Sequence, residues 1–185
     1  ENERGTFIYN SKDLCMIDHI KELAEAGVTS FKIEGRAKSA YYVAVTTNAY
    51  HMAMEYYKKG LETPKWVLDE VYKCSHREYS TGFFYGYNPP TQNYETSGYE
   101  RDYDVVGIIK ECKDGRIFAS QRNKFFNGDT VEILVPEKEP VTLKVSGLMN
   151  EEGELIETAN HAMMNFSFEC SETFPPESII RCRVN

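Results

Sequence analysis

The hydrophobic pattern of this chain changes its period once, and the change limits the folds that the sequence can adopt. Before about residue 88, apolar residues recur every three or four positions over long stretches, which predicts helices. From Tyr103 onward they alternate with polar residues, which predicts strands. Residues 89–102 are rich in proline, glycine and small polar residues, as is typical of a linker. The sequence therefore predicts an α+β chain of two parts, 1–88 and 103–185.

The first part is predicted to hold a βαβ unit followed by two helices. Asn10 or Ser11 is the expected N-cap of the first helix, and Gly27 follows its end. The second helix is apolar around much of its circumference, which predicts burial on more than one side. Strands joined by a helix run parallel as neighbours in one sheet. The predicted elements are a strand at 6–9, a helix at 12–26, a strand at 30–34 and helices at 40–59 and 65–74.

The second part is predicted to be a set of short antiparallel strands. Lys113-Asp114-Gly115 and Asn127-Gly128-Asp129 are turn signals between apolar runs. Short strands at this spacing, with no helix between them, predict a small antiparallel barrel or a sandwich, and the residues alone leave both open. The expected strands lie at 105–109, 116–121, 131–135, 141–145, 155–158, 164–169 and 178–183.

Residues 30–39 form the stretch with the clearest chemical content. Apolar and charged residues alternate over 31–34, a glycine follows, and Arg36 and Lys38 precede Ser39, the expected N-cap of the second helix. One interpretation is a site for an anionic ligand, since cations gather beside a free helix N-terminus. The other is a strand end held by a Lys–Glu or Arg–Glu ion pair. The residues alone do not decide between them.

Composition excludes several classes of protein. The net charge is −8, and neither part has the basic excess of a free-standing nucleic-acid binder. No apolar run approaches the length of a membrane span. The five cysteines form no C-x-x-C pair, so free thiols in a reducing cytoplasm are expected. The four histidines form none of the common zinc motifs, so no metal site is expected within this chain.

Five short motifs together resemble the U32 "collagenase-like" peptidase family, particularly its bacterial members linked to tRNA wobble-uridine hydroxylation. The resemblance covers essentially the whole chain. The motifs are Asn10-Ser11-Lys12-Asp13-Leu14, the stretch from Phe31 to Ser39, Tyr41-Tyr42-Val43-Ala44, Ser80-Thr81-Gly82-Phe83, and Gln121 to Phe125 with Gly128-Asp129.

This resemblance implies a fold and a cofactor. Residues 1–88 are expected to be the C-terminal βαβα portion of a TIM-like barrel, and residues 103–185 an appended antiparallel β-barrel. Family members place cysteines earlier in the barrel, where related proteins hold an iron–sulfur cluster. None of the five cysteines here matches that signature, so no cofactor is expected within this chain. We therefore expect a fragment that is inactive alone and that associates with itself through exposed apolar surface.

The resemblance also implies an activity, the formation of 5-hydroxyuridine in tRNA, with tRNA as the partner and prephenate as a reactant. In TIM barrels the chemistry lies where strands end. Asn10 to Asp13 follows one predicted strand, and Glu34 to Lys38 follows the next. The expected catalytic residues are Glu34, Lys32 and Asp13. The expected substrate- or anion-binding residues are Arg36, Lys38, Ser39, Asn10, Ser11 and Lys12.

Two other functions stay open. The family label suggests a peptidase acting on a protein or peptide, although the sequence has no G-x-S-x-G and no paired zinc histidines. The second part is alternatively an RNA- or protein-binding module. Arg122, Asn123 and Lys124 lie beside Phe125 and Phe126, which places cations next to aromatic rings. The competing interpretation is a hairpin loop with both rings in the core and the cations in solvent.

Overall fold

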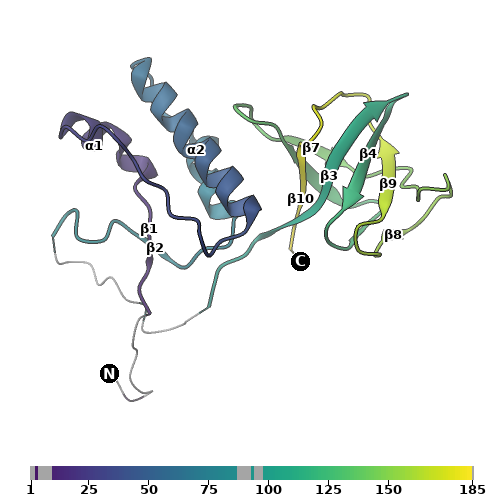
Figure 1. The fold of residues 1–185 in the computed structure, drawn as a ribbon, viewed down its shortest axis with the longest axis horizontal. Helices are drawn as coiled ribbons and strands as arrows, with labels where there is room; N and C mark the ends of the chain where they lie inside the picture. The colour runs from purple at the N-terminus through teal and green to yellow at the C-terminus, as the bar shows by residue number, and fades with distance from the viewer. Residues whose placement is uncertain (1–2, 4–9, 87–92, 94–97, 185) are drawn as a thin grey trace. The chain divides into compact units, whose positions relative to one another are not determined.

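The computed structural model describes residue 3, residues 10–86, residue 93 and residues 98–184 (Figure 1). The chain divides into two compact units, residues 1–102 and residues 103–185, and each is described by itself. The strand predicted at 6–9 and most of the predicted linker lie outside the described residues.

A long helix, α2 (Ala40–Lys58), is the largest element of the first unit. Ser39 caps it as predicted, because its hydroxyl oxygen accepts a hydrogen bond from the Tyr42 backbone at 3.2 Å. Gly60 lies just past its C-terminus with φ of +68°, a conformation that glycine adopts without strain. The predicted helix at 40–59 is therefore confirmed to within one residue.

One face of α2 forms the hydrophobic core of the first unit. The core also takes residues from α3 (Lys65–Glu70) and from the 3₁₀ helix η2 (Val71–Lys73). The helix predicted at 65–74 is therefore α-helical only over its first six residues and ends one residue early. The buried members of the core are Ile17, Ile20, Ala49, Met52, Ala53, Val67 and Val71.

The helix predicted at 12–26 is wrong over its first third. Asp13–Leu14 form a short strand, β1, which is followed by a 3₁₀ helix, η1 (Ile17–His19), and a short helix, α1 (Ile20–Glu25). The Asp13 and Cys15 amides donate to the Glu78 and Ser80 carbonyls at 3.0 and 2.9 Å. These bonds hold the backbone extended, so neither Asn10 nor Ser11 caps a helix.

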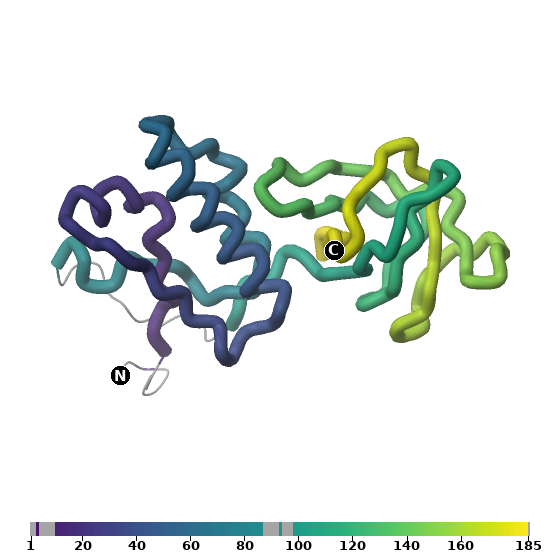
Figure 2. Tube along the Cα trace, turned by 45° about the horizontal axis from the view of Figure 1, so that its top comes forward, coloured from purple at the N-terminus to yellow at the C-terminus, as the bar shows by residue number. Residues whose placement is uncertain are grey.

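The strand predicted at 30–34 is also wrong. Residues 28–35 run without regular secondary structure toward α2 (Figure 2), although Phe31 and Ile33 are half buried while Lys32 and Glu34 are exposed, as the alternation predicts. A strand needs a hydrogen-bonded neighbour, and this segment has none among the described residues. The sheet of the described first unit is β1 paired in parallel with β2 (Tyr79–Ser80). A βαβ unit is therefore not formed in the described part of the chain.

The second unit is built on a six-stranded antiparallel sheet that curls around its own core. Its strand order is β7-β6-β10-β3-β4-β9, and a two-stranded sheet pairs β5 with β8. The strands are β3 (Tyr103–Lys113), β4 (Arg116–Gln121), β5 (Phe125–Phe126), β6 (Thr130–Leu134), β7 (Val141–Lys144), β8 (Thr158–Ala159), β9 (Asn165–Glu169) and β10 (Ile179–Arg183).

Most of the strands predicted in the second unit are confirmed. The β3–β4 hairpin turns through Asp114 and Gly115, both at positive φ, as the Asp-Gly pair predicts. The strand predicted at 155–158 is displaced, since β8 begins at Thr158, where it pairs with β5. In residues 103–184 the two edge strands share no ladder, so the sheet is a curled half-barrel rather than a closed one.

No helix in the described residues has both the length and the apolar character needed to cross a membrane.

Candidate functional site

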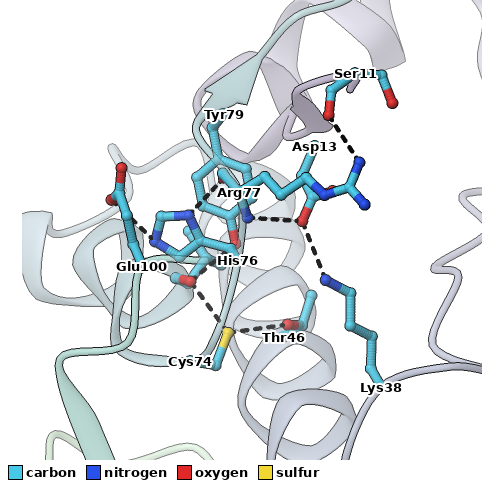
Figure 3. A network of polar contacts seen from close by, with 10 residues as sticks. Ser11, Asp13, Lys38, Thr46, Cys74, His76, Arg77, Tyr79 and Glu100 are labelled. Carbon is cyan, nitrogen blue, oxygen red and sulfur yellow. Dashed lines mark hydrogen bonds and ion pairs between the residues drawn. The ribbon is translucent and has the colours of Figure 1, made fainter. Parts of the chain in front are cut away.

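One carboxylate oxygen in the first unit links three segments that are distant in sequence (Figure 3). Asp13 Oδ2, on β1, accepts hydrogen bonds from Lys38 Nζ and from the Arg77 backbone nitrogen, each at 3.1 Å. Both the Asp13 and Lys38 side chains are largely shielded from solvent. This arrangement holds Lys38, just before α2, beside the residues that lead into β2.

Two cations converge on the ring of Tyr99. Lys38 Nζ lies 4.7 Å from the Tyr99 ring centroid and 5.0 Å from that of Tyr42. The Arg77 guanidinium carbon lies 5.3 Å from the Tyr99 centroid, and Arg77 Nη1 donates to the Ser11 carbonyl at 3.2 Å. Asp13, Lys38 and Arg77 form a cluster of two cations and one carboxylate, so the cluster has a net positive charge.

A buried histidine fixes the chain on either side of this cluster. His76 Nδ1 lies 2.7 Å from the Arg77 carbonyl oxygen, so that nitrogen is assigned as the donor. His76 Nε2 lies 3.8 Å from Glu100 Oε2, and the ring stacks on Tyr79 at 4.1 Å. His76 and Glu100 also exchange backbone hydrogen bonds. The segment that carries Tyr99 is thereby tied to the segment that carries Arg77.

The structure brings together only some of the residues predicted for the site. Asp13, Lys38 and the Ser11 backbone meet in the cluster, whereas Asp13 lies in a strand rather than after one. Lys12 pairs with Glu78, and Asn10 donates to the Asn93 carbonyl at 2.5 Å.

The charged residues of the predicted turn lie apart from that cluster. The Glu34 carboxylate accepts a hydrogen bond from the Arg36 backbone nitrogen at 2.8 Å, which is a local turn contact. Lys32, Glu34 and Arg36 are exposed, and none bonds to Asp13, Lys38 or Arg77 in the described structure. The expected Lys–Glu or Arg–Glu ion pair does not form among the described residues of this stretch; its Lys38 pairs with Asp13 instead.

Sequence analysis missed Arg77 and Tyr99. Arg77 lies two residues before β2, and Tyr99 falls in the stretch predicted to be linker. The available signal was the His76–Arg77 pair of potential cations two residues before an aromatic strand residue, Tyr79. The spacing of 64 residues between Asp13 and Arg77 gave no local pattern to detect.

The thiols of the first unit are not arranged as nucleophiles or metal ligands. Burial raises the pKa of both the Cys15 and the Cys74 thiols, which keeps them protonated. No group of three or more His, Cys, Asp or Glu side chains in the described residues is placed to hold a metal ion. The residues that the structure describes therefore offer no set of ligands for an iron–sulfur cluster.

In the second unit, two of the three predicted RNA-contact residues already make local bonds. Asn123 donates its side-chain amide to the Val105 carbonyl at 2.8 Å, and Arg122 Nη1 donates to the Ser120 hydroxyl at 2.7 Å. Lys124 Nζ lies 4.8 Å from the ring of Phe126, which is 46% exposed. Phe125 is buried, so only one of the two rings enters the core.

Two family models cover nearly the whole chain. Residues 1–94 match the model described as peptidase family U32, and residues 101–181 match the U32 C-terminal domain. The chain therefore belongs to peptidase family U32, as the sequence motifs predict.

Its relatives include proteins named for tRNA hydroxylation. The chain is 31% identical to tRNA hydroxylation protein P1 of Bacillus subtilis, over 97% of this chain and 44% of that protein. It is 35% identical to tRNA hydroxylation protein P of Escherichia coli, over 86% of this chain and 36% of that protein. An uncharacterized protease of Methanocaldococcus jannaschii is 48% identical over 44% of this chain. The chain thus spans less than half the length of these relatives.

Among solved structures, the chain is similar to the C-terminal domain of a Geobacillus thermoleovorans protein named for the U32 peptidases. The identity is 26%, the match covers 42% of this chain and 98% of that domain, and the TM-score is 0.40.

Proposed function

We propose that the protein takes part in tRNA hydroxylation at the wobble uridine, with tRNA as its partner. The observation that carries the proposal is the similarity to tRNA hydroxylation protein P1, which extends over 97% of this chain and so includes both units. Because the chain covers 44% of that relative, the proposal concerns the whole protein. In the whole protein, we propose that the first unit belongs to a TIM-like barrel.

The exposed turn at residues 32–36 is our proposed contact for the reacting part of the substrate. Lys32, Glu34 and Arg36 are exposed and offer two cations and one carboxylate. Glu34 is suited to accept or donate a proton, and Arg36 to hold a carboxylate or phosphate with two parallel hydrogen bonds. Asp13 has a different part in the proposal, since its carboxylate positions Lys38 and the Arg77 backbone. An iron–sulfur cluster is proposed only outside this chain, and no step here depends on it.

Nucleoside mass spectrometry of tRNA tests the proposal. Cells that lack the whole gene are complemented with wild type, with Glu34→Ala, or with Glu62→Ala as a matched control, since Glu62 is also exposed but lies in the loop after α2. We expect 5-hydroxyuridine to disappear on deletion and to return with wild type and Glu62→Ala, but not with Glu34→Ala. Unchanged nucleosides on deletion would exclude the function for this protein.

The second candidate function is RNA binding by the second unit. It is favoured by Lys124, whose ammonium lies over the exposed ring of Phe126. Arg122→Ala with Lys124→Ala is expected to weaken RNA binding while leaving the fold intact, as judged by circular dichroism. Binding equal to wild type would reject this module. The peptidase alternative has less support, because burial raises the pKa of the Cys15 and Cys74 thiols, opposite to the shift that an activated thiolate needs.

A further inference from the structure

Part of the Arg77 guanidinium makes no hydrogen bond to the described residues. Nη1 donates to the Ser11 carbonyl, but Nε is buried and finds no hydrogen-bond acceptor among the described residues. Arg77 forms no ion pair through its side chain in that part of the chain, since Asp13 accepts from its backbone nitrogen rather than from the guanidinium. A buried donor without an acceptor is rare in folded proteins, which makes this guanidinium unusual among the described side chains.

The surroundings of the guanidinium select a negatively charged ligand. Lys38 lies on the same aromatic ring as Arg77, and its ammonium has one carboxylate partner, Asp13. The Tyr99 ring centroid lies 5.3 Å from the guanidinium carbon. Nη2 makes no hydrogen bond to the described residues and, unlike Nε, is not buried, so Nη2 is the nitrogen that a ligand can reach. Nη1 and Nη2 together form the outer end of the guanidinium fork, which can donate to two oxygens of a phosphate or carboxylate group.

The geometry points to Arg77 as the binding residue for a backbone phosphate of RNA, with the ring of Tyr99 beside it as a surface for the attached base. Tyr99 is 50% exposed, so a base has access to part of the ring. This inference rests on the proposed function for its choice of RNA. It adds Arg77 to the residues proposed for that function, and Arg77 lies outside the two motifs, residues 10–14 and 31–39, that contain the predicted site.

The His76–Glu100 contact gives the site its shape. His76 bonds the Arg77 carbonyl, and Glu100 follows Tyr99 directly, so the two sides of the site are joined by one buried ring. His76 is accordingly a positioning residue.

The experiment measures binding of the whole protein to a fluorescent 17-nucleotide anticodon stem-loop RNA across a range of salt concentrations. The variants are Arg77→Lys, which keeps the charge but loses the forked edge, and Arg77→Ala. The matched control is Lys59→Ala, an exposed cation at the end of α2 in the same unit. Arg77→Lys is expected to weaken binding roughly tenfold, and Arg77→Ala to reduce the slope of log K against log salt by about one. Lys59→Ala is expected to bind like wild type.

Several outcomes overturn the inference. Wild-type affinity and slope in a folded Arg77→Ala protein would do so. If Arg77→Ala does not fold, the inference is overturned when Arg77→Lys binds RNA with wild-type affinity and has an unchanged melting temperature. Inorganic phosphate is a separate probe. An Arg77-dependent rise in melting temperature with phosphate, together with unchanged RNA binding, would assign the site to a small free oxyanion instead.

Failure of the inference is distinguishable from failure of the proposed function. RNA binding that depends on Arg77, in a protein whose deletion leaves 5-hydroxyuridine unchanged, would keep the inference and reject the function. Loss of 5-hydroxyuridine on deletion of the gene, with RNA binding independent of Arg77, would support the function and reject the inference.

Discussion

Asp13 and Lys38 form an ion pair 3.1 Å long across 25 residues of sequence, and the same carboxylate oxygen binds the backbone of Arg77. A single side chain therefore connects β1, the turn before α2 and the residues that lead into β2. Because the pair is largely shielded from solvent, removing one partner leaves the other without its counter-charge.

Asp13→Ala is expected to lower the free energy of unfolding by about 1–3 kcal/mol, since two donors lose their acceptor. Urea denaturation measures the change. Asp18→Ala, an exposed carboxylate five residues away, is the control and should remain close to wild type. Combining Asp13→Ala with Lys38→Met should cost less than the sum of the two single changes. Additive losses would mean that the ion pair is not coupled.

Ser39→Ala is expected to destabilise the first unit by about 1 kcal/mol, because the Tyr42 amide loses the hydroxyl that caps α2. Ser39→Asp keeps a capping oxygen and should stay within a few tenths of wild type. Ser30→Ala is a suitable control, since Ser30 is exposed and lies outside any helix. Thermal unfolding followed at 222 nm reports the difference, and equal effects at both serines would argue against the cap.

Gly107→Ala is expected to destabilise the second unit by about 1–3 kcal/mol through overpacking. A Cβ at this position would lie 2.8 Å from the Phe166 ring in the buried core. The smaller Phe166→Leu side chain should relieve the clash, so the double variant is compared with Phe166→Leu alone. If Gly107→Ala costs the same in both backgrounds, contact with Phe166 is not the cause.

Arg181 is completely buried in β10, where its Nε donates to Glu132 Oε2 at 2.8 Å and its guanidinium lies 5.0 Å from the Tyr103 ring. Arg181→Met alone is expected to cost about 3–5 kcal/mol, because Glu132 then loses this ion-pair partner in a partly buried position. Adding Glu132→Leu should recover most of that loss in chemical denaturation. If Arg181→Met with Glu132→Leu is no more stable than Arg181→Met alone, the unpaired Glu132 carboxylate is not the cause of the loss.

Stability is expected to fall in alkali because of the buried thiols. Burial raises the pKa of Cys74 and Cys15, so the folded protein holds these protons more tightly than the unfolded chain does. The contribution of these thiols to the free energy of unfolding is full below the thiol pKa of the unfolded chain. It is lost as the pH rises from that value through the raised pKa of the folded protein. Urea midpoints at pH 7.5, 9 and 10 should decline, and the decline should be smaller in Cys74→Ala. An identical decline in that variant would place the effect elsewhere.

Local signals predicted the parts of the fold that depend on neighbours in sequence. The α2 helix, its Ser39 cap and the Asp114-Gly115 turn each follow from a few consecutive residues, and each is confirmed. The helix start at residue 12 was wrong for the opposite reason. Asp13 is held extended by residues 78–80, and nothing within one helical turn of it signals that pairing.

The candidate site divides in the same way. Lys38 and Asp13 were both selected from motifs, but only the structure shows that they bind each other. Arg77 and Tyr99 had no motif, because their role comes from a cluster assembled across more than 60 positions of sequence. Long-range contacts of this kind leave no periodic trace in one sequence, whereas helix caps and hairpin turns do.

The strand order of the second unit makes its folding depend on one strand. β10 lies between β6 and β3, so it alone joins the β7–β6 pair to the β3–β4–β9 group within the six-stranded sheet. Each half without β10 would present an unpaired strand edge of the kind that recruits other chains. The second unit is therefore expected to open as one cooperative block, and a partly folded chain that has not yet docked residues 179–183 is the species most prone to aggregate.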